Sequence, residues 1–117
     1  MSDPTLKLIV LKTDQIESVR AFYAQLGFQF QQEQHGKGPV HYSAKLGEGI
    51  LEVYPLPSNG SVDRAMRLGF GVTNVAMILE TLDDLGEVVS REKQTPWGLR
   101  AVVRDPDGRT VELYQAT

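Results

Sequence analysis

The sequence predicts an α+β protein in which two βαβββ modules follow one another and form a curved mixed sheet around a cleft. The first observation is a repeat, because Leu51-Glu52-Val53-Tyr54 returns sixty positions later as Val111-Glu112-Leu113-Tyr114. The second is a pair of helix-like stretches that match at an offset of fifty-nine and end at Leu26-Gly27 and Leu85-Gly86. A breaker-rich stretch at 55–61 separates the halves. Self-similarity at a fixed spacing indicates a duplicated structural unit, so both halves should have the same order of elements.

The first half reads as strand, helix and three further strands. Residues 7–12 are aliphatic and typical of a buried strand. Thr13 and Asp14 are cap-type residues, and the apolar side chains that follow at helical spacing stop at Gly27. The remaining strands are expected at 28–31, 41–46 and 50–54, the last two as a hairpin.

The second half repeats this order after the linker. A short helical turn is expected at 62–67, and Thr73-Asn74 should cap the second helix. Asp105-Pro106-Asp107-Gly108 has the residues that favour a tight turn. Strands are expected at 67–72, from 88 onward, at 99–104 and at 110–114.

The length of 117 residues fits one domain and is too short for two independent ones. We expect a single domain with module 1 at about 5–56, a linker at about 55–65 and module 2 at about 66–117. No apolar run approaches the roughly 20 residues needed to span a bilayer, and no export signal is visible, which favours the cytoplasm. A net charge of -3 argues against nucleic-acid binding and leaves a small molecule as the expected partner.

Several short motifs together resemble a known family. They are Phe22-Tyr23, Leu26-Gly27-Phe28, Trp97-Gly98-Leu99-Arg100, Asp105-Pro106-Asp107-Gly108 and Val111-Glu112-Leu113. In this order, and within a doubled βαβββ pattern, they resemble the vicinal oxygen chelate superfamily, which includes glyoxalase I, bleomycin- and fosfomycin-resistance proteins and extradiol dioxygenases. The resemblance covers almost the whole chain and implies a glyoxalase-like fold.

The resemblance also implies a set of metal-ligand positions. Enzymes of this family hold a divalent metal with a His or Gln on the first strand of each module and usually a Glu on the last strand of each. The matching first-strand positions carry Leu8 and Arg67, and the last-strand positions carry Glu52 and Glu112. Leucine has no donor atom and guanidinium is permanently positive. We therefore expect no metal cofactor; a metal, if one bound, would use Glu52 and Glu112.

The two glutamates and Arg67 are the first candidates for the ligand-binding cleft. Glu52 and Glu112 could act as ligands or in acid/base chemistry, or they could be an inherited pair held by a salt bridge. Two inward carboxylates without a metal need a compensating cation. The repeat places Arg67 beside them, although a solvated surface arginine is the alternative.

Aromatic residues and histidines complete the candidate site. Tyr54 shares the parity of Glu52 and could fill the core or offer a hydroxyl to a ligand, and core packing is the expectation for Tyr114. Trp97 could cover the cavity or pack against the turn at 105–108. His35 is expected on the surface without a metal-ligand pattern, and His41 is expected near the cleft mouth, as a general-base candidate.

These observations predict a homodimeric protein that binds a small organic ligand in its cleft without the family's complete metal site. The ligand-binding residues would be Glu52, Tyr54, Arg67, Trp97, Glu112 and His41. The alternative is a metal-dependent lyase, isomerase or dioxygenase with an atypical ligand set, such as both glutamates with His41 and water. A further alternative is an assembly partner whose cleft is filled by side chains. Whether the chain is an enzyme is left open, since this fold hosts many chemistries.

Overall fold

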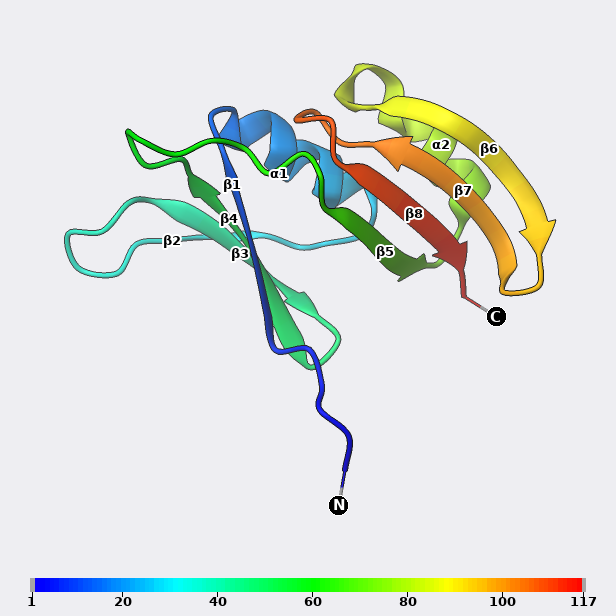
Figure 1. The fold of residues 1–117 in the computed structure, drawn as a ribbon, viewed down its shortest axis with the longest axis horizontal. Coiled ribbons are helices and arrows are strands. Elements are labelled where there is room, and N and C mark those ends of the chain that lie inside the picture. The colour runs from blue at the N-terminus through cyan, green and yellow to red at the C-terminus, as the bar shows by residue number, and fades with distance from the viewer. Residues whose placement is uncertain (1, 117) are drawn as a thin grey trace.

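The two predicted βαβββ modules are present in the computed structural model, which describes residues 2–116 (Figure 1). Thr117, the last residue of the expected second module, lies outside the described residues. The first module consists of β1 (Leu8–Thr13), α1 (Ile16–Gln25), β2 (Gln31–Glu33), β3 (His41–Leu46) and β4 (Gly49–Pro55). The second consists of β5 (Arg67–Val72), α2 (Val75–Leu82), the 3-10 helix η1 (Asp83–Leu85), β6 (Glu87–Thr95), β7 (Gly98–Arg104) and β8 (Thr110–Gln115).

The strands form two mixed sheets of four rather than one continuous sheet. The orders are β1-β4-β3-β2 and β5-β8-β7-β6, so the outer strand β1 or β5 is parallel to the last strand of its module. Leu8 pairs with Ile50 in the first sheet, and Arg67 pairs with Thr110 in the second. These pairs keep the offsets of the sequence repeat, so the two modules share one strand register.

In Figure 1, α2 lies behind β6 and β7, and α1 lies between the two sheets, where it contacts β1, β4 and α2. In α1 the side chains of Val19, Phe22 and Tyr23 are fully buried, which accounts for its helical spacing of apolar residues. The start of α2 is capped by Asn74, whose Oδ1 accepts a hydrogen bond from the backbone N–H of Met77 at 3.1 Å. None of the helices in the described part of the chain is long and apolar enough to cross a membrane.

A polar joint ties the modules together at the turn between β7 and β8. Tyr23 of α1 donates its hydroxyl to Asp105 Oδ2 at 2.8 Å, and Arg109 Nη1 donates to the same oxygen at 2.9 Å. Arg109 also donates from Nη2 to the backbone carbonyl of Lys12 in β1 at 2.9 Å. Burial, followed by the charge of Asp105, raises the pKa of Tyr23 far above its usual value, so the phenol remains the donor.

Two sequence-based expectations about elements are wrong. Residues 28–30 are not a strand, because Phe28 packs edge-on against Phe70 with ring centroids 5.3 Å apart and pairing with β3 starts only at Gln31. Residues 62–66 contain no helical turn. Asp63 Oδ1 instead accepts the backbone N–H groups of Ala65 and Met66, an alternative that a short acidic side chain offers to the backbone.

The faces of the sheets opposite the helices are open. On the first sheet Leu8, Val10 and Ile50 are 54%, 37% and 42% exposed, although all three are aliphatic. Leu11, Leu51 and Val53, on the opposite face of the same strands, are buried. The alternation of each strand therefore leaves an apolar surface on the open side.

Candidate functional site

The open face of the second sheet carries a group of polar side chains that we call the Glu112 cluster: Arg67, Arg100, Glu112 and Tyr114. Arg67 Nε lies 2.9 Å from Glu112 Oε2, and Arg100 Nη2 lies 2.9 Å from Glu112 Oε1. Tyr114 donates its hydroxyl to Oε1 at 2.6 Å. Both carboxylate oxygens of Glu112 are thus engaged by guanidinium groups.

The surroundings of Glu112 stabilise its charged form. The hydroxyl of Tyr114 and, against the opposing effect of burial, the guanidinium of Arg100 hold the pKa of Glu112 below its usual range. The hydrogen bond to Glu112 raises the pKa of Arg100 in turn. Two cations around one carboxylate leave a net positive charge, and Arg67, whose side chain is 71% exposed, presents it to solvent.

The register explains this arrangement. Glu112 lies opposite Gly69 of β5 and Val102 of β7, and Tyr114 lies opposite Gly71 and Arg100. The two partners on β5, Gly69 and Gly71, have no side chains and leave space on the open face beside the cluster. The sequence analysis missed Arg100 as a site residue, although the antiparallel pairing across the 105–108 turn would have placed it on this face.

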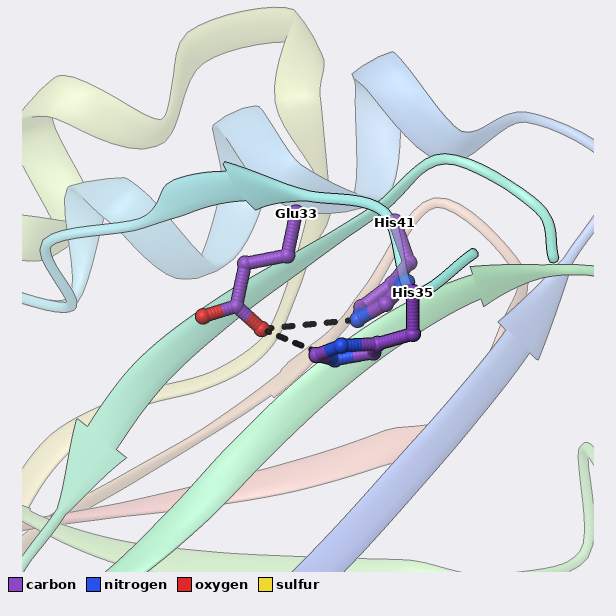
Figure 2. Close-up of side chains that lie close together, drawn as sticks. All are labelled: Glu33, His35 and His41. Carbon is purple, nitrogen blue, oxygen red and sulfur yellow. Dashed lines mark ion pairs between the residues drawn. The ribbon is translucent and has the colours of Figure 1, made fainter. Parts of the chain in front are cut away.

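The open face of the first sheet carries a second group, the His41 cluster: Glu33, His35, His41, Glu52 and Tyr54. Figure 2 shows Glu33, His35 and His41 converging from β2, the following turn and β3. His41 Nε2 lies 3.4 Å from Glu33 Oε1 and 3.6 Å from Glu52 Oε2. The ring of Tyr54 stacks on that of His41, with centroids 4.0 Å apart and an angle of 10° between the planes.

The structure corrects several expectations about individual residues. His41 is buried, at 1% exposure, and is not a surface residue. The two histidines are not isolated, since His35 and Glu33 have ligand atoms close to those of His41. Trp97 is not packed on the 105–108 turn, since it is 77% exposed at the turn between β6 and β7; its role in ligand binding stays a prediction. Tyr114 is no core filler, because its hydroxyl bonds to Glu112.

The two glutamates do not share polar partners. Among residues 2–116, the ion pairs and hydrogen bonds of Glu112 stay within the second module, and the contact of Glu52 with His41 stays within the first. His41 and Tyr54 accompany Glu52, whereas Arg67 accompanies Glu112. Five of the six candidate residues are therefore divided between two clusters, and the sixth, Trp97, belongs to neither.

Two hollows border these clusters. The larger, about 700 Å³, lies where β2 is too short to cover the edge of β3, and its lining includes Ser43, Lys45 and Ile50. Ser43 pairs with Glu52 across β3 and β4, so the His41 cluster lies at the border of this hollow. The smaller, about 370 Å³, lies between the β3–β4 turn and β5, and its lining includes Gly69 and Gly71.

The residues at the family's four metal positions do not fit a divalent metal. Leu8 offers no donor atom, and Arg67 presents a guanidinium at 2.9 Å from the carboxylate that a metal would need. Arg100 occupies the other oxygen of Glu112. The guanidinium of Arg67 thus pairs with Glu112 at positions that bind a metal ion in the family enzymes named above.

Solved structures share this architecture at low sequence identity. TnmS3, an antibiotic-binding protein from Streptomyces sp. CB03234, is 21% identical with a TM-score of 0.71, and the match covers 100% of this chain and 99% of that one. A lactoylglutathione lyase from Agrobacterium tumefaciens is 19% identical with a TM-score of 0.67, covering 99% and 96%. A glyoxalase/bleomycin resistance protein/dioxygenase family enzyme from Burkholderia phytofirmans PsJN is 15% identical with a TM-score of 0.73, covering 95% and 98%.

These similarities establish the fold, and a family model establishes the family. No curated protein sequence matches this chain significantly. The model of the glyoxalase/bleomycin resistance protein/dioxygenase superfamily matches residues 5–113, nearly the whole chain, and the βαβββ repeat agrees with it. This protein therefore belongs to the glyoxalase/bleomycin resistance protein/dioxygenase superfamily.

Proposed function

We propose that this protein binds a small, largely apolar organic molecule carrying one anionic group, and that it does so without a metal at the family's four ligand positions. The observation that carries the proposal is the Glu112 cluster, in which two guanidinium groups engage one carboxylate. The excess positive charge is available to a carboxylate or phenolate of a ligand, which guanidinium groups recognise well.

The apolar part of the ligand would lie on the open face of the first sheet. Leu8, Val10 and Ile50 form a continuous exposed surface there, since Leu8 pairs with Ile50 and Val10 follows Leu8 on the same side of β1. Exposed apolar patches of this kind mark binding surfaces. The antibiotic-binding protein from Streptomyces, which has the same fold, supports a binding role.

A second copy of the chain would close the cleft. The radius of gyration is 14.7 Å, against about 13.4 Å for a compact domain of this length, so one copy alone is more extended than a typical compact domain. In a homodimer the apolar face of one protomer could cover the Glu112 cluster of its partner. Both parts of the binding surface would then contact one ligand.

Titration of the tag-free, chelator-treated protein with matched ligands tests the proposal. Aromatic carboxylates and phenolates are compared with the corresponding amides and methyl ethers by calorimetry. We expect the anionic members to bind more tightly, and Arg67→Ala to remove that preference by lowering affinity at least about fivefold. Arg91→Ala is the matched control, because Arg91 is also an exposed arginine, 63% exposed, but pairs with Glu92 on β6. Equal binding of anionic and neutral members would contradict the proposal.

A further inference from the structure

We propose that Glu33, His35 and His41 form a binding site for a divalent transition metal of the zinc class, with Glu52 beside the open coordination position. The site lies at the sheet edge where β2 meets β3, and three of these residues come from neither the first nor the last strand of a module (Figure 2). It is independent of the ligand-binding proposal above.

The first argument is that His41 is buried with one ring nitrogen lacking a hydrogen-bond partner. Its side chain is 1% exposed, and Nε2 has no hydrogen-bond partner among the described residues. Nδ1 lies 3.2 Å from the backbone carbonyl oxygen of Pro39, a contact in which Nδ1–H is the donor. In the neutral imidazole, donation from Nδ1 to a carbonyl leaves the lone pair on Nε2, which is the arrangement that metal-binding histidines have in proteins. A buried lone pair without a partner is costly unless something occupies the space in front of it.

The distances between donor atoms are the second argument. His41 Nε2 to Glu33 Oε1 is 3.4 Å, and His35 Nε2 to the same oxygen is 3.8 Å. The ligand atoms of the three residues all lie within 4.8 Å of one another. Two ligands of a tetrahedral zinc ion, each about 2.0–2.1 Å from the metal, are about 3.4 Å apart. The separations are thus long for direct hydrogen bonds and close to those of ligands that share one metal.

The charge balance is the third argument. No lysine or arginine among residues 2–116 forms an ion pair with Glu33 or Glu52, whereas Glu112 has two guanidinium partners. Both carboxylates direct an oxygen toward the same nitrogen of His41, at 3.4 and 3.6 Å. Negative charge therefore gathers around a point that has no fixed cation of its own. A metal ion at that point would balance it.

The donor types decide the class of metal. Two imidazoles and a carboxylate suit zinc and the neighbouring transition metals, whereas calcium and magnesium prefer oxygen ligands alone. Three protein ligands leave a fourth position for water, and Glu52 Oε2, 3.6 Å from His41 Nε2, is placed to accept a hydrogen bond from that water. Tyr54 stacked on His41 keeps the imidazole plane fixed.

Calorimetric titration of tag-free protein with Zn²⁺ tests the site, and one-dimensional NMR follows the ring protons of the two histidines of the chain. We expect stoichiometric binding, with the signals of both His35 and His41 shifted. Glu33→Gln and His35→Ala should each weaken Zn²⁺ binding at least about tenfold. His35 is 74% exposed and Glu33 is 35% exposed, so neither change threatens folding, in contrast to a change of the buried His41. Mg²⁺ should not bind.

Glu112→Gln is the matched control, because it removes the last-strand glutamate of the other module and leaves the proposed site intact. Binding lost in Glu112→Gln but retained in Glu33→Gln would place the metal at the family's positions and overturn the proposal. Zn²⁺ binding that is absent from the wild type, or unchanged in both Glu33→Gln and His35→Ala, would also overturn it.

Discussion

Glu52 and Glu112 occupy equivalent positions of the repeat but have different surroundings. Glu112 lies between two arginines and a tyrosine hydroxyl, whereas Glu52 has a histidine nitrogen at 3.6 Å. The first arrangement fixes a negative charge and surrounds it with donors. The second leaves carboxylate oxygens around a lone pair. The same position of the repeat thus has a cationic setting in one module and a histidine beside it in the other.

Replacing Glu112 by Gln tests the energetic role of its cluster. The change leaves two arginines without their shared carboxylate, and we expect a loss of about 1–2 kcal/mol in the free energy of unfolding, reduced by the exposure of Arg67. Urea unfolding measures it. Glu48→Gln, at an exposed position in the β3–β4 turn, is the control and should be neutral. Equal free energies of unfolding for Glu112→Gln and Glu48→Gln would show that the ion pairs of Glu112 do not stabilise the fold.

The stabilisation by Glu112 should depend on pH in a defined direction. Its pKa in the folded state is below the ordinary value of 4.5, so folding is favoured by the charged form. The contribution is therefore fully present above about pH 4.5 and is lost as the pH falls through the lower folded pKa. We expect the stability difference between wild type and Glu112→Gln to shrink below that pH. A difference that grows on acidification would contradict the lowered pKa.

At the scale of elements, the start of β6 is fixed by close packing against α1. A methyl group on Gly86 would lie 2.5 Å from the carbonyl oxygen of Arg104 and 2.7 Å from Phe22 Cε2. Gly86→Ala should therefore cost about 1–3 kcal/mol through overpacking, measured by thermal or urea unfolding. Gly71→Ala is the matched control, since nothing lies within 4 Å of its added methyl group. Similar losses in the two variants would rule out packing as the cause.

Local patterns predicted most elements because helices and strands impose periods of 3.6 and two on apolar residues. These patterns failed in two places. In one, a side chain formed hydrogen bonds with nearby backbone groups, and in the other, tertiary packing drew a side chain away from the expected strand. Asp63 formed its own turn in place of the expected helical turn, and Phe28 turned into the aromatic core in place of a strand. The first outcome depends on local side-chain-to-backbone hydrogen bonds and the second on a contact with the distant Phe70, and apolar periodicity contains neither.

The sequence could place only those candidate-site residues that the internal repeat relates to each other. The repeat alone brings Arg67 onto the face of Glu112, and the structure has this ion pair at 2.9 Å. Arg100 and Glu33 reach their clusters through antiparallel pairing across turns, so their place depends on register rather than on the repeat. Neither the repeat nor strand register places Trp97, because it lies in a turn, where side chains do not alternate between the two faces of a sheet.

At the scale of the whole molecule, the open apolar face should drive self-association. We expect a dimer by size-exclusion chromatography with light scattering, and a monomer after Leu8→Glu, because a charge at this face would be buried on association. Met77→Glu is the control, since Met77 is 58% exposed on α2, away from the open face. A wild-type monomer at high concentration would contradict a cleft closed by two copies.

The joint between the modules should dominate global stability. Asp105 accepts hydrogen bonds from Tyr23, from Arg109 and from two backbone N–H groups, all in a buried setting. Asp105→Asn replaces one acceptor by a donor and removes one of the two carboxylates that pair with the buried Arg109, which keeps Asp107 at 3.0 Å, so we expect a loss of about 3–5 kcal/mol by urea unfolding. Asp63→Asn, at an exposed position, should change stability by less than about 1 kcal/mol.

This joint also has a consequence for the order in which the chain folds during its synthesis. The hydroxyl of Tyr23 forms its hydrogen bond with Asp105, which follows 82 residues later in the chain. The carbonyl of Lys12 accepts its hydrogen bond from Arg109, which follows 97 residues later. Contacts so distant along the chain require large loops to close and form late. The first module can pair its strands once β4 has left the ribosome, but its helix gains its last polar partners only near the end of translation. Nascent chains that stop before Asp105 should therefore be far more sensitive to protease than the complete chain.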